Sequence, residues 1–580
     1  MSSSAECRPI GWGGWGPDPN TSPTRAAIKW FADPRSLHHQ QCACGLWNAR
    51  RAMQWVIPAP PRIWIDDQPR MVKLAYILGA VTVFLTSGNA ADVSPTSSVA
   101  ASTTPSAADS LSSLGLSLPA GNVLVGNNET FTASSPYYEP LIDEAWSGNC
   151  RLNASCIVTP KSAQEVSLVI QVLSILDTKF SIRSGGHSSS PGFSSIGSNG
   201  VLVALERLNT LSISADRKTL TVGPGNRWEA VYQYLEQYNL TVLGGREPVV
   251  GVGGFVLGGG LSLFYNTNGL AIDTVTRFQV VTPNGTIVNA TPTEHADLYK
   301  GLKGGLNNFG IIVEYDLTTN TGIDVWFEVK NYTRAETPAL LAAYATYLQN
   351  ADVRSNVEIQ ANPAYTVVLY GYLDHVSAPS AFNAFSTVPS VSTVYPPTNA
   401  SLNEVLLEIG TAGVTGSSWT YTVSFSFKVT NPDFLQESYK TYLEAAASLL
   451  PSGVLLEYVP QGIIPNLVTK GQAQNGGNLL GLEATPQVWG EIFAQFPATV
   501  SQSTVASAVN DLLAKITSSA ESQGVHLPYI FANDAGPDQQ VLRGYGEDNL
   551  KYIATVAERY DPKGVMQKLQ NDAYFVSKEL

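Results

Sequence analysis

The chain has 580 residues, enough for one large domain or two to three ordinary ones. Hydrophobic residues make up 44% of it and charged residues only 14%, which excludes a disordered, highly charged polypeptide. The formal net charge is −13 and no basic stripe is present, so we expect no nucleic acid among its partners.

The first ninety residues differ from the rest of the chain. Residues 71–90 combine Lys73, an apolar run and small residues before Ala91, a pattern that predicts a secretory signal peptide. The apolar run is shorter than the roughly 20 residues that a membrane span needs, so no anchor is expected in the mature chain. A buried core helix is the alternative. We interpret residues 1–70 as an overextended reading frame, with translation from Met71 and a secreted or secretory-lumen product.

Cys150 and Cys156 are the two cysteines that follow this signal. An even pair in an exported chain predicts a local disulfide, and no nearby histidine supports a metal site instead. Asn-x-Ser/Thr sequons at this density fit a glycosylated extracellular protein. They lie at Asn128, Asn153, Asn239, Asn284, Asn289, Asn331 and Asn399.

Residues 91–136 are rich in Ser, Ala, Thr and Pro and predict a solvated linker. Beyond it, Ser162 and Glu165 form a capping-box pattern ahead of apolar residues at helical spacing. Helices are then expected over 228–237, 340–348 and 503–516. Strands are expected over 180–183, 201–204, 220–222, 367–372 and 421–429, with a hairpin over 278–288.

A first glycine-rich segment follows the strand expected over 180–183. Adjacent glycines let a ligand approach the backbone and leave N–H groups free to face phosphate oxygens, and an arginine adds positive charge beside them. Turns that need glycine for purely structural reasons are the alternative. The segment is Arg183-Ser184-Gly185-Gly186-His187-Ser188.

A second segment contains six glycines between 251 and 260. So many glycines lower the stability of the fold unless a ligand or another backbone lies against them. Neither segment is a standard dinucleotide fingerprint or phosphate loop, because the required helix-opening spacing and the Lys-Ser/Thr pair are missing. The spacing alone indicates a phosphate-bearing ligand held by two loops. The positions of interest are Val250, Gly251, Gly253, Gly254, Gly258 and Gly259.

These two segments and Asp297–Ile311 closely resemble the FAD loops of the p-cresol methylhydroxylase and vanillyl-alcohol oxidase superfamily. The closest resemblance is to the fungal berberine-bridge-enzyme-like oxidoreductases. Tyr545–Leu550 and Tyr560–Val565 are similar to the closing segment of the same family, and the motifs occur in the family's order over about 137–575.

The resemblance implies an α+β fold. Residues 137–322 would form a two-lobed FAD-binding domain of the p-cresol methylhydroxylase type, which residues 526–580 would complete. Residues 323–525 would form an α/β substrate domain that carries an antiparallel sheet.

The resemblance also implies covalent attachment of FAD through His187; a histidine that is only hydrogen-bonded in the loop is the alternative. Many relatives form a second bond through a cysteine where this chain has Glu247, so we expect a single linkage. A small residue at Val250 is associated with oxygen access, which favours an oxidase; ordinary strand packing is the alternative. Ile311 and Asn533 complete the expected cofactor-binding residues.

Three residues are candidate catalytic groups. Asn533 matches a family segment that lies against the flavin, whereas Asp534 stands where many relatives have Tyr. Asp534 could act as a base if desolvated, although a solvent-facing turn carboxylate is the favoured interpretation. Tyr458 and Glu457 are further candidates, although a core-facing Tyr and a solvent-facing Glu are the favoured interpretation.

The implied reaction transfers hydride from a small organic substrate to FAD, which dioxygen then reoxidises with release of hydrogen peroxide. A carbohydrate or small alcohol is the first expectation for the substrate. The alternatives are a tailoring oxidoreductase or oxidative cyclase of secondary metabolism, and a flavin-holding binding or defence protein with little turnover.

Overall fold

The structure, a computed structural model, describes residues 130–321, 323–409 and 418–580. The predicted reading-frame extension over 1–70, the predicted signal peptide over 71–90, the sequon at Asn128 and nearly all of the expected linker lie outside the described residues. The described residues form three sheets, two near the glycine-rich segments and one large antiparallel sheet.

The first sheet has four strands and is mixed. Strands β2, β4 and β3 run parallel, and β1 pairs antiparallel with β2. Helix α6 (Ala163–Ile175) connects β2 to β3, as a crossover between parallel strands requires. In pairing order the strands are β1 (Thr130–Phe131), β2 (Cys156–Val158), β4 (Gly200–Ala204) and β3 (Lys179–Arg183).

The capping pattern at the start of α6 is confirmed in one of its two hydrogen bonds. The Ser162 hydroxyl accepts a hydrogen bond from the Glu165 N–H at 3.2 Å. The Glu165 carboxylate accepts from the Lys161 N–H at 2.8 Å, one residue earlier than a full capping box would have it.

The second sheet has five antiparallel strands, and the predicted hairpin is its β7–β8 pair. Gly285 supplies the positive φ (+85°) that the hairpin turn needs. The strands, in pairing order, are β5 (Leu211–Ile213), β6 (Thr219–Val222), β9 (Ile311–Thr318), β7 (Val275–Val281) and β8 (Ile287–Ala290). The helices around these two sheets are α5 (Tyr138–Asp143), α7 (Trp228–Glu236), α8 (Val252–Leu257), α9 (Tyr265–Asn268) and α10 (Ala296–Leu302).

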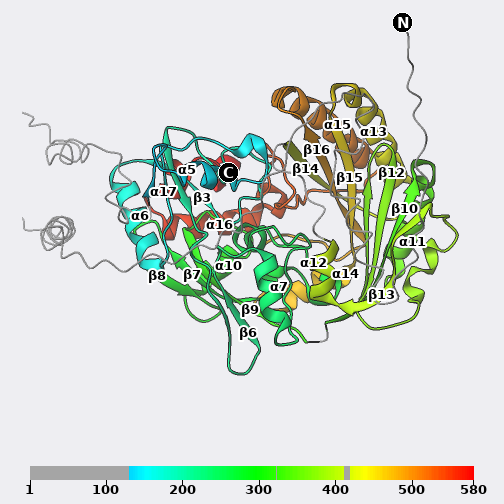
Figure 1. Cartoon of the computed structure of the whole chain (residues 1–580), viewed down its shortest axis with the longest axis horizontal. Coiled ribbons are helices and arrows are strands. Elements are labelled where there is room, and N and C mark those ends of the chain that lie inside the picture. The colour runs from blue at the N-terminus through cyan, green and yellow to red at the C-terminus, as the bar shows by residue number, and fades with distance from the viewer. Residues whose placement is uncertain (1–129, 322, 410–417) are drawn as a thin grey trace, which may run out of the picture. The chain divides into compact units, whose positions relative to one another are not determined.

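The C-terminal segment returns to the first two sheets, where red and cyan-to-green ribbons lie together in Figure 1. Phe180 of β3 forms a parallel bridge with Gln570, and α16 packs on α10. The N- and C-terminal parts of the chain therefore build one structure around the glycine-rich segments. The helices of this segment are α16 (Glu547–Tyr560), α17 (Val565–Leu569) and α18 (Val576–Glu579).

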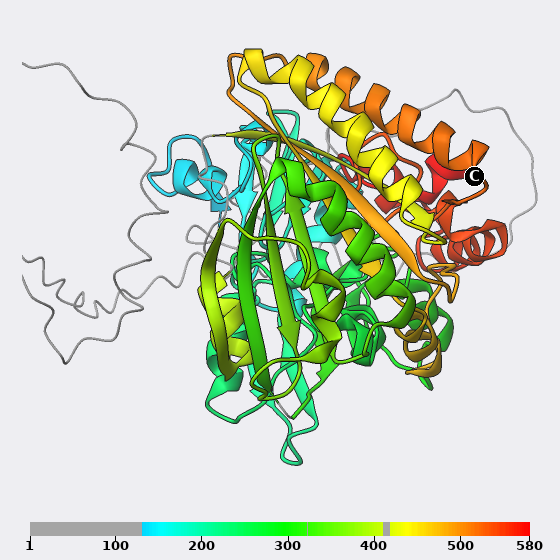
Figure 2. The same cartoon turned by 90° about the vertical axis from the view of Figure 1, so that its right-hand side faces the viewer.

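The third sheet has eight antiparallel strands. Helices α11 (Thr337–Asn350), α13 (Asp433–Leu449) and α15 (Gln502–Ser522) cover one face, and Figure 2 shows α13 and α15 side by side across it. Helix α14 (Pro465–Ala473) contacts α9, and α12 (Leu402–Ile409) contacts α7 as well as two strands at one edge of the sheet. In pairing order the strands are β13 (Ser392–Ser401), β10 (Asp324–Thr333), β12 (Tyr365–Tyr372), β11 (Ser355–Ala361), β15 (Leu455–Ile463), β16 (Gln487–Phe496), β14 (Trp419–Lys428) and β17 (His526–Leu527).

Side chains alternate between the two faces of this sheet, as strand geometry requires. On β15, Leu456 and Tyr458 point to the helix-covered face and belong to the core beneath α11, α13 and α15. The opposite, inner face carries Phe327 and Trp489, which belong to the core around the glycine-rich segments. The sheet thus separates two hydrophobic cores and presents one face toward the predicted cofactor loops.

The predicted fold class is confirmed: a mixed α/β arrangement of two smaller sheets with an antiparallel sheet over them. No helix in the described ranges is long and apolar enough to cross a membrane. The boundaries predicted at 322/323 and 525/526 stay predictions.

Two sequence-based expectations are wrong. The structure does not join Cys150 to Cys156, because the buried Cys150 thiol donates a hydrogen bond to the Ser188 carbonyl at 3.2 Å. The second glycine-rich segment is not entirely a loop, since residues 252–257 form helix α8.

Candidate active site

The two glycine-rich segments lie backbone to backbone. A Cβ atom at Gly185 would stand 2.4 Å from the Gly251 backbone, so only glycine allows this approach. The Ser184 hydroxyl joins the segments, since it accepts a hydrogen bond from the Gly253 N–H at 3.1 Å and donates to the Pro224 carbonyl. Part of the glycine density is therefore explained by contact between the segments themselves.

Gly254 shows a different reason for glycine. It is exposed, and a Cβ there would meet nothing within 4 Å. The surface beside it is formed by Asn533, whose amide oxygen accepts from the Gly260 N–H at 3.2 Å and whose amide nitrogen donates to the Gly254 carbonyl at 3.3 Å. The open side of Gly254 leaves the backbone accessible to a ligand.

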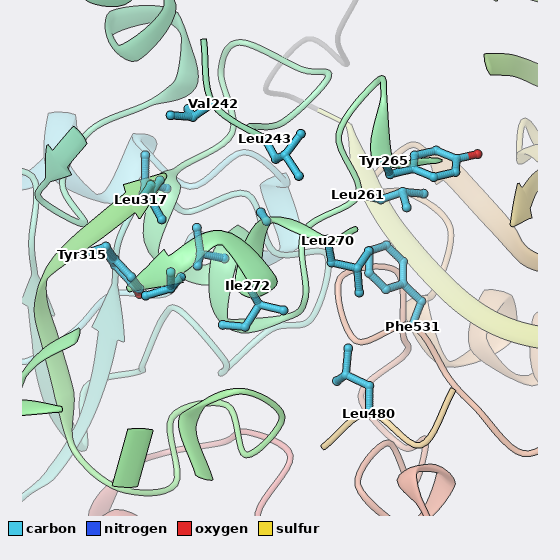
Figure 3. Close-up of a cluster of buried hydrophobic side chains, with 14 of the residues drawn as sticks. Val242, Leu243, Leu261, Tyr265, Leu270, Ile272, Tyr315, Leu317, Leu480 and Phe531 are labelled. Atoms are coloured by element: carbon cyan, nitrogen blue, oxygen red, sulfur yellow. The ribbon is translucent and has the colours of Figure 1, made fainter. Parts of the chain in front are cut away.

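The C-terminal segment is held against the second glycine-rich segment by apolar contacts. Figure 3 shows Phe531 beside Leu270, with Leu480 below them. A Cβ on Gly259 would lie 3.5 Å from both Phe531 and Leu270. This packing fixes the position of Asn533 and Asp534, which follow Phe531 in the chain.

His187 is partly exposed at the junction of these segments. Its ring stacks on Trp146, with centroids 4.2 Å apart and planes 18° from parallel, and the Trp146 N–H donates to the Gly186 carbonyl at 2.9 Å. Burial, and secondarily the positive charge of Arg227, lower the pKa of His187 to about 4. The imidazole is therefore neutral near pH 7 and has a nitrogen lone pair available for bonding.

The contacts of Arg183 are with protein groups, and its predicted role at a phosphate stays a prediction. The side chain is buried and donates to the Leu141 carbonyl, and Glu206 and Glu144 are the carboxylates that act on it. Its charge is thus engaged by protein groups.

Three further predicted cofactor residues have mainly backbone or core contacts. The Ser188 hydroxyl bonds to the Ser190 carbonyl, and the Val250 carbonyl accepts from the Trp228 N–H at 3.1 Å. Ile311 begins β9 and is buried in the core between α6 and the first sheet.

A network of charged and amide side chains lies between the inner face of the large sheet and the C-terminal segment. Arg246 forms an ion pair with Glu358 at 3.2 Å and donates to the Gln461 amide oxygen at 2.5 Å. The Gln461 amide nitrogen in turn donates to the Asp534 carboxylate at 2.6 Å. Gln461 therefore couples Asp534 to Arg246.

Asp534 is turned inward, so its interpretation as a solvent-facing turn carboxylate is wrong. Desolvation raises its pKa, and the charge of Arg246 and the hydrogen bond from Gln461 oppose that rise. A raised pKa makes a carboxylate a stronger base, which suits general-base catalysis.

Two further carboxylates lie in the same region. Glu457 is partly exposed: it accepts a hydrogen bond from the exposed Gln360 at 2.7 Å, and desolvation raises its pKa. Glu247 is accessible to solvent, and desolvation by the surrounding protein, with the charge of Glu358 adding to it, raises its pKa to about 7.

Tyr458 lies on the other side of the sheet from this network. It is fully buried and its hydroxyl hydrogen-bonds to the Ser438 hydroxyl at 2.8 Å, beside the rings of Tyr439 and Tyr442. Strand alternation therefore excludes Tyr458 as a base for a substrate bound at the inner face.

Sequence reasoning missed Trp146, Arg246, Gln461 and Glu491. Glu491 had a recognisable signal, because it is the one charged residue in the otherwise uncharged strand Gln487–Phe496. The other three had none, since their partners are more than 35 residues away in the chain.

These residues fit FAD. The exposed backbone at Gly254 can approach a dinucleotide closely, and the neutral imidazole of His187 can bond to a flavin carbon. Among the described residues, no cluster of three or more His, Cys, Asp or Glu side chains could hold a metal ion. The geometry thus combines a cofactor cradle with an adjacent set of acid–base groups.

Comparison with known proteins identifies the family. The family description "FAD binding domain" matches residues 154–291. The FAD-dependent monooxygenase macF of Penicillium terrestre is 66% identical over 526 residues, which cover 88% of this chain and 100% of that protein. The bifunctional solanapyrone synthase of Alternaria solani is 30% identical over 459 residues, 77% of this chain and 87% of that protein.

The fold is also found among solved structures. That of xylooligosaccharide oxidase from Myceliophthora thermophila C1, in complex with xylobiose, superimposes with a TM-score of 0.66 over 77% of this chain and 96% of that one, at 19% identity. The family predicted from the motifs is confirmed. The chain belongs to the fungal FAD-dependent oxidoreductases that share the fold of the berberine-bridge-enzyme-like and p-cresol methylhydroxylase-type oxidases.

Proposed function

We propose that this enzyme is a tailoring oxidoreductase of secondary metabolism, which oxidises a small organic molecule with Asp534 as general base. The observation that supports this most is the chain of hydrogen bonds from Arg246 through Gln461 to Asp534, next to Asn533 on the glycine-rich segment. It supports the proposal because an anchored carboxylate follows Asn533 of the C-terminal segment and bonds to Gln461 of the large sheet.

Bound FAD would supply a two-electron acceptor. For an alcohol substrate, the C–H bond would break with transfer of hydride to FAD, and the hydroxyl proton would pass to the Asp534 carboxylate, which leaves a carbonyl product. Gln461 would hold Asp534 at a fixed orientation, and Arg246 would stabilise its anionic form before the transfer.

We further propose that His187 holds the FAD covalently and that no second bond forms, since Glu247 stands at the position of the second attachment in many relatives. The neutral imidazole supports this, because protonated histidine has no lone pair to form a bond. The stacked Trp146 ring would fix its orientation.

The relatives' names support a natural product rather than a carbohydrate as substrate. One is called a solanapyrone synthase and another a monooxygenase. Our first expectation, a sugar or simple alcohol, now rests only on expected secretion and on a shared fold. Dioxygen would be the second substrate, with peroxide as its product if Val250 admits it to the reduced cofactor.

The test is flavin bleaching without oxygen. Purified holoenzyme would be mixed anaerobically with fungal polyketide, terpenoid and alkaloid intermediates, and with xylobiose and simple alcohols as the carbohydrate and alcohol arm. We expect bleaching by a natural product and recovery of colour on admission of air. Peroxide release and incorporation of ¹⁸O into the product would separate oxidase from monooxygenase turnover. Bleaching by xylobiose alone would contradict the proposal.

Secretion is a separate proposal. It is supported by the exposure of the sequon residues Asn153, Asn239 and Asn399. N-terminal sequencing of protein from the culture medium should begin near Ala91; a product that retains residues 1–70 would contradict it.

A further inference from the structure

Glu491 lies on strand β16, between two residues whose rings pack against other parts of the candidate site. Its neighbours on the inner face are Trp489, whose ring packs against Phe531 at 5.2 Å, and Phe493, whose ring lies 5.9 Å from Trp146. The first contact leads to the segment that bears Asp534 and the second to the ring stacked on His187. Glu491 therefore faces the region where substrate and cofactor must meet.

The carboxylates around Glu491 already have donors. Glu358 is paired with Arg246, Asp534 accepts from Gln461, and Glu457 accepts from Gln360. Glu247 is exposed enough for water to solvate it. Glu491 is partly buried, and no hydrogen bond or ion pair of its carboxyl group occurs among the described residues.

The charged groups that act on Glu491 are Asp534, Arg246 and Glu457. Arg246 is the one cation of the three, and it is already engaged by Glu358 and Gln461. Of two neighbouring carboxylates that share one cation, each disfavours ionisation of the other, and the one with fewer hydrogen-bond donors gives up its proton less readily. Burial, followed by the charge of Asp534, raises the pKa of Glu491 well above its usual range.

We propose that Glu491 is a second catalytic residue of the proposed reaction, which holds a proton at neutral pH and donates it in a hydrogen bond to a substrate oxygen. This inference rests on the proposed function. In the alcohol oxidation described above, Glu491 would keep its proton throughout, while hydride passes to FAD and the hydroxyl proton passes to Asp534. Glu491 would thus act as the hydrogen-bond donor and Asp534 as the base.

The inference predicts that substrates present an oxygen that accepts a hydrogen bond next to the oxidised carbon. A carboxylate-bearing compound whose anion lies at that point would be repelled by Asp534, because Arg246 is already paired. Neutral hydroxyl or carbonyl compounds fit this arrangement best.

Infrared spectroscopy tests the protonation state without a substrate. Holoenzyme at neutral pH should show the C=O stretch of a protonated carboxylic acid that disappears in E491Q and persists in D534N. Because Glu247, with a pKa of about 7, would add a glutamate acid band of its own, the spectra are recorded in the Glu247→Gln background. In that background, ¹³C labelling at glutamate carboxyl groups should still shift the band, which assigns it to another glutamate even if E491Q fails to fold. A spectrum in which E491Q removes no acid band, or labelled Glu247→Gln protein shifts none, would overturn the inference.

A second test uses sodium sulfite, an anion that adds to oxidised flavins. E491Q replaces one neutral group by another and should leave the Kd for sulfite unchanged, whereas D534N removes a negative charge and should tighten binding several-fold. Equal tightening in both variants would mean that Glu491 is ionised and would overturn the inference. Because neither test needs turnover, failure of the proposed substrate class would leave their result intact.

Discussion

The two faces of the eight-stranded sheet differ in how fully their polar groups are hydrogen-bonded or paired with opposite charge. On the helix-covered face, Tyr332 and Tyr458 of the strands and Tyr442 of the covering helix α13 are buried, and each hydroxyl bonds to a hydroxyl or carbonyl within the same core. On the inner face, Glu457 and Glu491 are partly exposed, and Arg246 is the one cation that acts on Glu491 and Asp534 among the described residues. Glu457 and Tyr458 are neighbours on β15 and face opposite sides of the sheet.

The difference shows how polar groups that stabilise the fold can be told apart from polar groups that take part in chemistry. A buried tyrosine that has its hydrogen bond is satisfied and adds stability. Carboxylates gathered with too few donors cost stability, and such a cost is typical of a functional site. Four changes would sharpen or break this contrast, from the largest expected effect to the smallest.

The first change is His187→Ala, next to the inner face. If His187 holds the cofactor, acid-precipitated wild-type protein stays yellow, whereas the variant releases all of its FAD into the supernatant. Flavin absorbance in the two fractions is the measurement. His295→Ala, an exposed histidine bonded to Tyr560, is the matched control. Yellow precipitate from His187→Ala would show that the linkage lies elsewhere.

The second change is Asp534→Asn, which keeps the shape of the side chain and removes the base. We expect flavin reduction by the substrate found in the anaerobic screen to slow by about 10²–10⁴-fold, the usual contribution of general-base catalysis. Stopped-flow absorbance measures it. Asp538→Asn, an exposed aspartate of the same segment, should react like wild type. A fast Asp534→Asn enzyme would remove Asp534 from the reaction.

The third change uses pH at Glu247. Its folded pKa of about 7 lies above its ordinary value of 4.5, so the folded state binds the proton more tightly than the unfolded state. Stability from this group is present below about pH 4.5 and is lost as pH rises through about 7. The Tm advantage of Glu247→Gln over wild type should therefore grow from pH 5 to pH 8. Glu294→Gln, at an exposed position, is the control; a pH-independent difference would contradict the assignment.

The fourth change, Tyr458→Phe, concerns the helix-covered face. It removes the hydrogen bond to Ser438 and should lower the free energy of unfolding by about 1 kcal/mol, a typical value for one hydrogen bond. Covalent FAD content and the rate of flavin reduction should stay at wild-type values. Denaturant titration and stopped-flow absorbance measure the two effects, with the exposed Tyr365→Phe as control. A large loss of rate would return Tyr458 to the active site.

Much of the fold could be predicted from the sequence, because it depends on patterns among residues that are close together in the chain. The apolar spacing after Ser162 predicted α6, and the Pro-Asn-Gly turn before Thr286 predicted the β7–β8 hairpin. The glycine-rich segments and their order along the chain predicted the family and FAD. Glycine spacing is informative because few other residues allow two backbones to approach as Gly185 and Gly251 do.

Only the tertiary structure decided which polar residues meet. Glu457 and Tyr458 are adjacent in sequence, yet strand alternation places them on opposite faces, and no periodicity within β15 says which face the cofactor loops cover. Arg246, Gln461 and Asp534 come from three distant parts of the chain, and their ion pair and hydrogen bonds exist only once the C-terminal segment packs on the glycine-rich segment. Desolvation, which raises the pKa values of Asp534 and Glu491, is likewise a property of the assembled site, because it depends on how much protein surrounds a group and not on its neighbours in sequence.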